Sequence, residues 1–347
     1  MSPEHVQENA EAEASLAGQF VVTANVRQAS PHQNVTALKF GGSSLFGAER
    51  MVHAAGLVQE AAGCSNVIVV VSAMKGVTDR LLSISRSLAE GRTSHARNEA
   101  EGVIHLHLNV LQDLQLHEEQ HDRVRRSLRL LARDLLHEVP LDGRVAATAE
   151  LADRLASFGE RFSARLFAAA LEKSGIAAVP VSSSDFVLTC DTFRDAKPHL
   201  EETRQRGRAV LLPLLEAGLV PVVTGFIGAT PDGRITTLGR NSSDFSGAII
   251  AHVVDAEELV IWTDVDGVYT ANPHDSVEAK LLHDLSYDEA HALAASGATV
   301  LHPHVLPLAA ETEMTIWVRN TFKPHVRGTR IGLPQSTNAG AQFGGAA

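Results

Sequence analysis

Cysteine is scarce in this sequence: Cys64 and Cys190 are the only two in 347 residues, and they have no CxxC spacing. This scarcity excludes a disulfide framework and favours a reducing compartment, so we expect a cytoplasmic protein. No run approaches the ~20 apolar residues of a membrane span, and we therefore expect no membrane partner. The acidic N-terminus also differs from a secretory or organellar leader.

Positive charge is scarce as well, with 30 Lys and Arg against 41 Asp and Glu, a formal net charge of −11. This balance argues against nucleic acid or an anionic membrane as the main partner. A small anionic ligand would need a locally positive pocket. The 17 histidines are scattered, and the pair His105 and His107 cannot share a helix face at a spacing of two. We therefore predict no metal site.

Strand and helix patterns alternate through most of the chain. Hydrophobic residues make up 44% of it, which is ordinary for a globular protein. The alternation predicts an α/β protein with a mainly parallel sheet and helices on both faces. We expect strands at 35–40, 66–73, 176–181, 219–228, 258–265 and 314–320. We expect helices at 48–62, after 74–76, and at 98–138, 146–174, 203–217, 286–296 and 303–312, with a hairpin turn at Asp232-Gly233.

The composition predicts one compact body with two loose ends. Residues 1–33 are acidic and are interpreted as a mobile tail, and the Gly/Ala-rich residues 332–347 as a disordered tail. The body between them spans residues 34–331.

Four loops at the expected carboxyl ends of strands carry unusual residues, and ligands bind at these ends in open α/β sheets. The loops are "KFGGSS", "SAMKGVTD", "TGFIG" and "WTDVDGVYTANP". In the first, Lys39 precedes two glycines that allow close backbone approach, which suits a phosphate cradle but equally a plain turn. In the last, Asp266-Gly267 predicts a turn, and Tyr269 offers a flat surface for a nucleotide.

A further loop, "TLGRNSSDFSGA" (237–248), leads into an apolar run. Ser242, Ser243 or Asp244 could cap a helix there, and an acid suits the positive end of the helix dipole. A capped helix is therefore one interpretation. The alternative is that Arg240 and Asp244 serve a ligand.

Six stretches occur together in the order found in aspartate kinases. They are "KFGGSS", "VVSAMKGVTDRLL", "FGERFSARL", "VVTGFIGATPDGRITTLGRNSSDFSGA", "IWTDVDGVYTANP" and "GATVLHPHVLPLA". The sequence resembles the catalytic domain of that family, within the amino-acid kinase superfamily, over roughly residues 35–331. The resemblance implies a three-layer sandwich, an amino-acid lobe at about 34–220 and a nucleotide lobe at about 221–331.

The resemblance also implies an activity. The family transfers the γ-phosphoryl group of ATP to the side-chain carboxylate of L-aspartate, giving 4-phospho-L-aspartate. A free aspartate carboxylate titrates near ~3.9, so no general base is needed to ionise it. Mg²⁺ would arrive with ATP, held largely by the phosphates. Family cores pair with one another, so a homo-oligomer, a dimer, is expected.

Site residues follow from the same resemblance. Lys39 would neutralise charge on the transferring phosphoryl group, Asp244 would organise the site, Glu160 would pair with the substrate ammonium, and Arg240 would hold its carboxylate. The substrate set is Ser43, Thr78, Glu160, Arg240 and Ser243. The nucleotide set is Gly41, Gly42, Thr263, Asp264, Tyr269, His274 and Thr299, and no residue is expected to be a metal ligand.

The chain departs from the family pattern on the nucleotide side. Thr299 stands where the family has a lysine, and Asn272 and His274 replace an acid and an arginine. The family also carries C-terminal ACT domains, which this chain lacks, so we expect no feedback inhibition through them. Two alternatives stay open: a kinase for a related amino acid in a specialised pathway, and a weakly active homologue that acts as a binding or regulatory subunit.

Overall fold

The computed structural model describes residues 34–141, 145–271, 278–295 and 301–334. Most of the two predicted tails, residues 1–33 and 335–347, lies outside these ranges, as do His274 and Thr299.

An eight-stranded sheet forms the centre of the described chain, in the order β10-β12-β11-β7-β1-β2-β4-β3. Every neighbouring pair is parallel except β11 and β12, so the predicted mainly parallel sheet is confirmed. The strands are β1 (Val35–Phe40), β2 (Asn66–Val71), β3 (Ala178–Val181), β4 (Val220–Thr224), β7 (Glu258–Thr263), β10 (Asp284–Leu285), β11 (Thr315–Asn320) and β12 (Thr329–Ile331).

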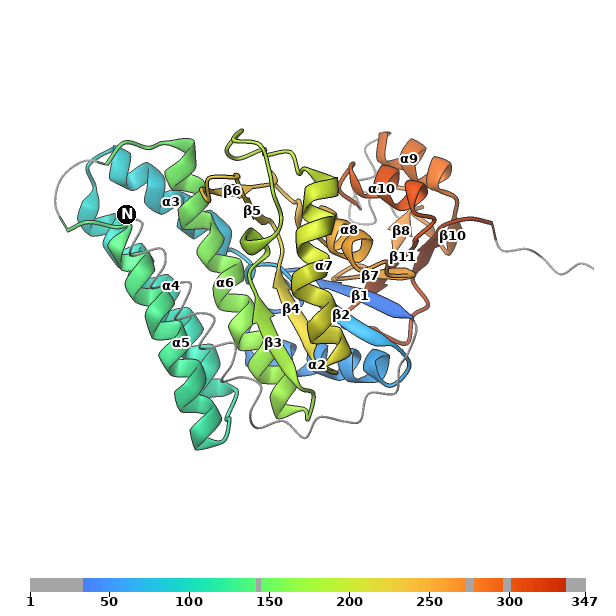
Figure 1. The fold of residues 1–347 in the computed structure, drawn as a ribbon, viewed down its shortest axis with the longest axis horizontal. Coiled ribbons are helices and arrows are strands. Elements are labelled where there is room, and N and C mark those ends of the chain that lie inside the picture. Colours follow the sequence, from blue (N-terminus) through green and yellow to red (C-terminus); the bar gives the residue numbers. More distant parts are fainter. Residues whose placement is uncertain (1–33, 142–144, 272–277, 296–300, 335–347) are drawn as a thin grey trace, which may run out of the picture.

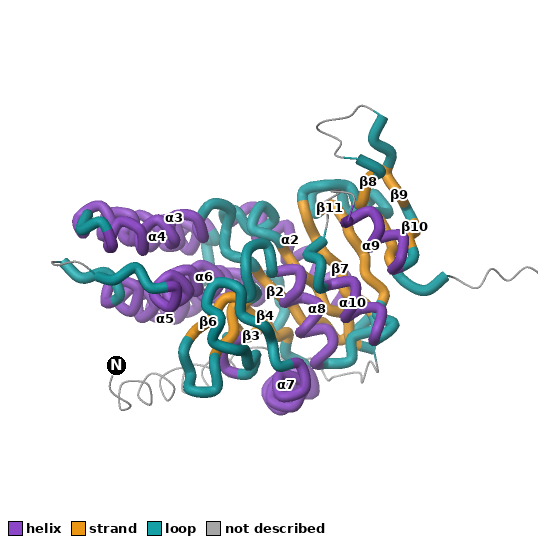
Figure 2. Tube along the Cα trace, turned by 90° about the horizontal axis from the view of Figure 1, so that it is seen from above, coloured by secondary structure: helices purple, strands orange, loops and turns teal. Residues whose placement is uncertain are grey.

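Helices cover both faces of this sheet, which gives three layers (Figures 1 and 2). The sheet residues alternate between two cores: Leu38 and Phe40 pack on one face and Ala37 on the other. The first core is shared with α2 (Ala48–Ala62), α3 (Val77–Ala89), α4 (Thr93–Asp113), α5 (Glu118–His137) and α6 (Ala149–Lys173). The second is shared with α7 (Leu200–Glu216), α8 (Ser243–Val253), α9 (Tyr287–Ala295) and α10 (Val305–Glu311).

The prediction of one helix over residues 98–138 is wrong, because this segment forms two helices, α4 and α5. Gln115 between them has φ 49°, in the left-handed region, which ends α4. Arg97 near the start of α4 donates to the carbonyls of Leu136 and Val139 at the end of α5, so the two helices are antiparallel. Apolar spacing continues on both sides of the turn, and the periodicity therefore did not reveal the break.

The strand expected at 219–228 is also divided. β4 ends at Thr224, Phe226 has φ 68°, and β5 (Ile227–Ala229) then pairs with β6 (Ile235–Thr237). The predicted hairpin turn is confirmed, with Gly233 at φ 84°. The strands that were not predicted, β8 (Val268–Tyr269), β9 (Leu281–Leu282), β10 and β12, have two or three residues each, too few to show a pattern.

His107 is an unusual core residue on α4. Its ring stacks on Phe162 of α6, and Nδ1 lies 2.7 Å from the Val103 carbonyl oxygen and must donate to it. Nε2 is buried without a partner among the described residues. Burial lowers the pKa of His107 to about 4, so the ring is neutral at pH 7.

We expect this histidine to weaken the fold in acid. Below pH 6.5 the unfolded chain binds a proton at this position and the folded chain does not, so the free energy of unfolding falls by up to about 3 kcal/mol between pH 6.5 and pH 4. Urea unfolding at several pH values should show a smaller loss in His107→Phe than in the unaltered protein. The exposed His105→Phe serves as control, and identical pH slopes in all three would contradict this account.

Candidate active site

Lys39 and Asp244 form an ion pair at the carboxyl end of β1. The Lys39 Nζ lies 2.6 Å from Oδ1 of Asp244, and the two side chains are only 9% and 16% exposed. Asp244 is in the first turn of α8, and Gly247 lets this helix lie close to β1, because a Cβ there would be 3.3 Å from Lys39 Cβ. The pair holds a positive charge in place, and an ammonium has three donors, so Lys39 can also bind an anion.

The two glycines after β1 bring three strand ends together. The Gly41 amide donates to the Trp262 carbonyl of β7, and Gly42 accepts from the Lys75 amide in the loop after β2. A Cβ on Gly42 would lie 2.4 Å from the Ala73 carbonyl oxygen, so only glycine fits. Ser43 follows, half-buried. The expected tight backbone approach is thus present, with the turn directly beside Lys39.

Glu160 enters the site from α6. The preceding Gly159 lets the helix approach the loop after β2, since a Cβ there would lie 2.6 Å from Ala73 Cβ. Glu160 Oε1 accepts from the Ala73 amide at 3.0 Å, whereas Oε2 has no partner among the described residues. The side chain is 2% exposed, and burial raises its pKa to about 8. A buried carboxyl group with one unpaired oxygen is suited to a cationic ligand.

Arg240 stands apart from these groups. Its side chain is 83% exposed, and its Nη2 lies 3.7 Å from Oδ1 of Asp79, which is 80% exposed. Asp79 and the half-buried Thr78 lie in the first turn of α3, so the loop before α8 and the start of α3 are neighbours. The structure therefore brings Arg240 to the rim near Thr78, where its long side chain can swing toward a ligand.

The start of α8 provides a second anion-binding feature. Ser242 is the N-cap residue but makes no side-chain cap, so the predicted helix is confirmed without a hydroxyl or carboxylate cap. A Cβ on Gly225 would lie 3.5 Å from Ser243 Cβ, which places this helix start over the end of β4. The buried Ser242 hydroxyl has no partner among the described residues. Uncapped amides and the positive end of the helix dipole favour an anion here, close to Lys39.

Three further residues expected to hold the nucleotide lie at or after the end of β7. Thr263 ends β7, Asp264 after it is exposed, and Tyr269 pairs with Leu281 across the β8–β9 hairpin. The turn predicted at Asp266-Gly267 is present: the Asp266 carboxylate accepts from Asn320 and Lys323, and Gly267 has φ 148°. His274 and Thr299 lie outside the described residues.

A ring cluster on α8 was missed in the sequence. Phe245, directly after Asp244, stacks on His302 with ring centroids 5.5 Å apart and contacts His304 at 5.3 Å. Burial and the neighbouring His304 lower the pKa of His302, whereas Asp244 acts in the opposite direction. Both histidines lie in the quoted "LHPH" stretch, but their spacing alone did not show that they pack on α8. They pack against the helix start that carries Asp244.

Asp153 was also missed. This α6 residue is 1% exposed, and its carboxylate accepts from the amides of Arg194 and Thr237 and from the Thr237 hydroxyl. Burial raises its pKa. The available signal was an acid inside an Ala/Leu-rich helix. Two of these hydrogen bonds join α6 to β6, which leads directly into the Arg240 loop, and the third holds the Arg194 amide.

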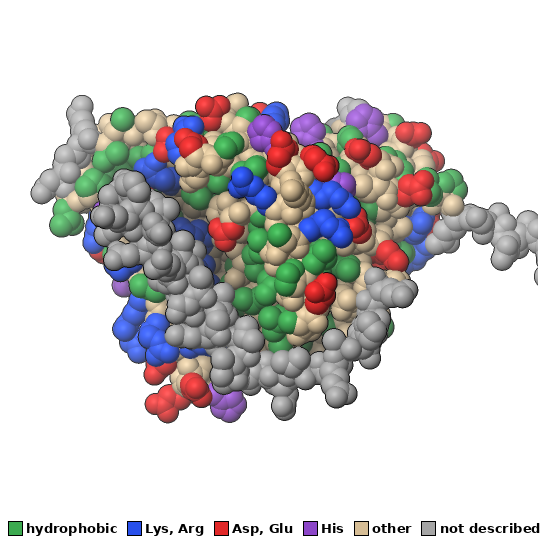
Figure 3. Space-filling model, in the orientation of Figure 1, with side chains coloured by type: hydrophobic (Ala, Val, Ile, Leu, Met, Phe, Trp, Pro, Cys, Tyr) green, Lys and Arg blue, Asp and Glu red, His purple; other side chains and the backbone are tan. Residues whose placement is uncertain are grey.

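Charged side chains of both signs and histidines gather along the upper edge of the molecule in Figure 3. Within the described ranges, no group of three or more His, Cys, Asp or Glu residues could hold a metal ion. Over those same ranges, no helix is long and apolar enough to cross a membrane.

Comparison with known proteins gives a consistent family. The model of the amino acid kinase family matches residues 34–320. Lysine-sensitive aspartokinase 3 of Escherichia coli is 31% identical over 293 residues, covering 84% of this chain and 63% of the relative. Aspartokinase 1, chloroplastic, of Arabidopsis thaliana is 32% identical, covering 85% of this chain and 51% of the relative.

Solved structures agree with this result. The structure of E. coli aspartokinase III in complex with aspartate and ADP has a TM-score of 0.78 at 29% identity, covering 86% of this chain and 64% of that one. The chain thus spans less than two thirds of the length of these relatives. Because the family model matches most of the chain, residues 34–320, the chain belongs to the amino acid kinase family.

Proposed function

We propose that this protein transfers the γ-phosphoryl group of ATP to the side-chain carboxylate of L-aspartate, giving 4-phospho-L-aspartate. The observation that carries this proposal is Glu160, a buried carboxyl group with one oxygen unpaired, at the same sheet edge as the Lys39–Asp244 pair. One group suits an α-ammonium and the other a phosphoryl group. The similarity to an aspartokinase solved with aspartate and ADP supports the same assignment.

On the amino-acid side, Glu160 would receive the substrate ammonium and Arg240 its α-carboxylate through a bidentate contact. Thr78, Ser43 and Ser243 would donate hydroxyl hydrogen bonds. Glu160 is covered in this conformation, so the segment around Ala73 must shift as substrate enters. The attacking carboxylate is already ionised at neutral pH, and the protein's task is positioning and charge neutralisation by Lys39, which Asp244 holds in place.

On the nucleotide side, Gly41 and Gly42 would present backbone amides to the phosphates, and Thr263, Asp264 and Tyr269 would lie along the nucleotide. His274 and Thr299 belong to the same proposed set. Mg²⁺ would neutralise phosphate charge. Because Asp244 is paired with Lys39 and the described residues hold no cluster of metal ligands, we propose that the ion is held largely by the phosphates.

The proposed organisation follows from these roles. Residues 34–220 would form the amino-acid lobe and residues 221–331 the nucleotide lobe, and two copies would pair as a homodimer. The free thiols Cys64 and Cys190 suit the cytoplasm. Light scattering of the purified chain measures the oligomeric state directly.

A hydroxamate assay tests the function. The protein is incubated with ATP, Mg²⁺ and hydroxylamine, which traps acyl phosphates, and with one amino acid at a time. We expect hydroxamate from L-aspartate and little from L-glutamate, because one more methylene moves the carboxylate out of line. Equal yields would contradict the assignment of aspartate. Aspartate binding without any hydroxamate would instead favour a binding or regulatory subunit.

The Arg240→Ala variant should raise the KM for aspartate. A charge-assisted hydrogen bond is worth about 1.5–3 kcal/mol, so kcat/KM should fall roughly ten- to a hundredfold. The melting temperature should stay constant, since Arg240 is exposed and has one loose contact, to Asp79. Asp79→Ala is the matched control and should leave KM nearly unchanged. If KM stays the same in Arg240→Ala, Arg240 is only a loop residue.

A further inference from the structure

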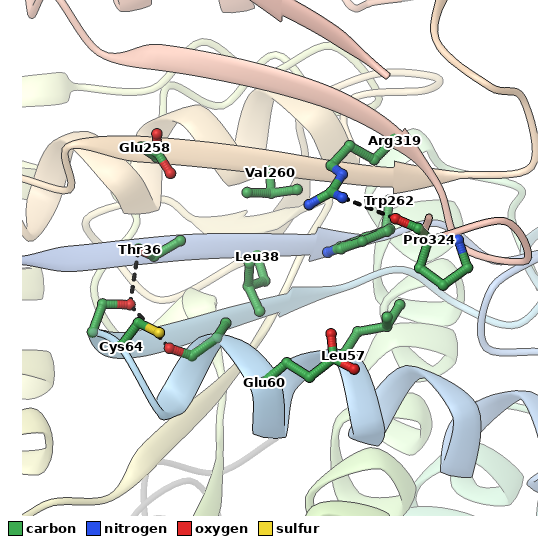
Figure 4. Close-up of a pocket in the computed structure, with 12 residues that line it drawn as sticks. Thr36, Leu38, Leu57, Glu60, Cys64, Glu258, Val260, Trp262, Arg319 and Pro324 are labelled. Carbon is green, nitrogen blue, oxygen red and sulfur yellow. Dashed lines mark hydrogen bonds between the residues drawn. The ribbon is translucent and has the colours of Figure 1, made fainter. Parts of the chain in front are cut away.

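A pocket of about 250 Å³ lies on the α2 face of the sheet, behind the proposed active site. Its floor is formed by Leu38, Val260 and Trp262, and its α2 wall includes Leu57 and Glu60. Figure 4 shows these side chains between the strands and the helix, with Arg319 from β11 above Trp262. Pockets for drug-sized ligands are about 300–1,000 Å³, so a molecule that fits here is small.

Two hydrogen-bond donors in this pocket lack acceptors. The indole Nε1 of Trp262 and Nε of Arg319 are buried and have no partner among the described residues, and Trp262 is 5% exposed. In Figure 4 the nitrogen atoms of both side chains point toward the middle of the pocket, above Leu38. Buried donors without acceptors are costly, typically about 1–3 kcal/mol each. An acceptor placed between them would remove this cost.

The Arg319 side chain can open this position. Its guanidinium carbon lies 5.0 Å from the centre of the Trp262 ring, and Nη2 donates to the Pro324 carbonyl at 2.9 Å. The rest of the guanidinium group makes no other hydrogen bond among the described contacts. Rotation about the flexible stem of Arg319 would uncover both nitrogens, and a carboxylate could then accept from the guanidinium and the indole together.

Acidic groups line other parts of the same pocket. Glu60 on α2 is exposed, and Glu258 at the start of β7 uses Oε1 to accept from Trp317 Nε1. In Figure 4, Val260 and Leu38 lie between Glu258 and Arg319, whereas Glu60 reaches in from α2 beside Leu57, below Trp262. From Arg319 to Glu258, the pocket lining therefore changes from positively charged donors, over an apolar floor, to a negative charge.

We propose that this pocket is a second ligand site, for a small aliphatic carboxylate that carries a cationic group at its other end. The carboxylate binds Arg319 and the Trp262 indole, the aliphatic chain lies on Leu38 and Val260, and the cation faces Glu258. The site is distinct from the Lys39–Asp244 site, and it does not depend on the proposed reaction.

The site is nevertheless next to the catalytic loop. The Trp262 carbonyl accepts from the Gly41 amide at 3.2 Å, and the Trp262 ring stacks on Phe40 with centroids 6.2 Å apart. A ligand on Trp262 therefore contacts the residue that holds the glycine turn beside Lys39. This position suits an effector.

Three probes with the same five-carbon chain test the carboxylate contact and the cation contact separately: valerate, 5-aminovalerate and pentylamine. Isothermal titration calorimetry should show saturable binding of 5-aminovalerate, weaker binding of valerate, and none of pentylamine at the same concentrations. Tryptophan fluorescence should change with the first two, because Arg319 leaves the ring. No binding of either carboxylate, or pentylamine binding as well as valerate, would overturn the proposal.

Variants then locate the site. Trp262→Phe keeps the ring and removes the indole donor, and Arg319→Gln removes the charge; each should weaken 5-aminovalerate at least about tenfold. Arg327→Gln, an exposed arginine paired with Asp284, is the matched control. Arg240→Ala should leave this binding unchanged, and its failure to do so would place the probe in the aspartate site instead. Unchanged affinity in both pocket variants would also overturn the assignment, whatever the hydroxamate assay shows.

Discussion

Replacement of Lys39 by methionine is expected to lower kcat by about a hundred- to a thousandfold, the usual effect of losing one preorganised donor to transition-state charge. Methionine keeps the length and the apolar stem of lysine but has no charge. The loss should appear mainly in kcat, because the charge on the phosphoryl oxygens is best stabilised in the transition state. Steady-state hydroxamate formation with saturating aspartate and ATP measures it.

Two controls separate catalysis from folding. Lys75→Met removes an exposed lysine in the neighbouring loop and should leave kcat within about twofold. Asp244→Asn should lower kcat and, combined with Lys39→Met, add little further loss, since the two residues act as one ion pair. Thermal unfolding must be recorded for each variant, because Lys39→Met leaves a mostly buried Asp244 without its cation. A folded Lys39→Met protein that keeps a third of its kcat would contradict the role of this lysine.

Replacement of Glu160 by glutamine should raise the KM for aspartate by at least about tenfold and leave the KM for ATP within about twofold. The amide keeps the shape of the side chain and can still accept from the Ala73 amide, but it cannot neutralise an ammonium. Hydrogen bonds to charged groups contribute about 1.5–3 kcal/mol, which sets the size of the effect. The exposed Glu101→Gln on α4 is the control. Equal rises in both KM values would argue against a specific ammonium contact.

Aspartate binding should also release a proton near pH 7. Burial raises the pKa of Glu160 to about 8, so the free protein holds this carboxyl mostly protonated, whereas a bound ammonium favours the ionised form. The affinity for aspartate should therefore rise as pH increases from 6 to 8. Calorimetry in two buffers with different ionisation enthalpies measures the released proton, and Glu160→Gln should abolish it. A proton count of zero in the unaltered protein would contradict the assignment.

Glu160 and His107 should change stability in opposite directions. The folded-state pKa of Glu160 is raised, so its contribution to stability is complete below pH 4.5 and is lost as pH rises toward 8. His107 has a lowered pKa, and stability falls as pH decreases from 6.5 toward 4. Because the windows overlap between pH 4.5 and 6.5, only the single variants reveal each slope.

Some of this molecule could be predicted from local sequence pattern. The β-branched run of β2 predicted a strand covered on both faces, and the patterns at 35–40 and 48–62 predicted a short strand and a helix; all three are confirmed. The turn before β6 was predicted because Asp-Gly suits a positive φ. The end of one helix and the start of the next within 98–138 could not be predicted, because the apolar periodicity continues across Gln115. The shortest strands were missed because their pairing partners, not their own residues, define them.

By itself, the sequence determined the alternation of strands and helices. It placed Lys39 near the end of a strand, Glu160 in a helix, and Arg240 and Asp244 in a loop that leads into a helix. Their roles came only from resemblance. Tertiary structure decided which groups meet: Lys39 with Asp244, Glu160 with the Ala73 amide, and Arg319 over Trp262. It also decided that the Glu160 side chain is buried and that only one of its two carboxyl oxygens, Oε1, has a hydrogen-bond partner among the described residues. The physical reason is that contact distance, desolvation and the resulting pKa depend on neighbours remote along the chain, and a local pattern carries no information about them.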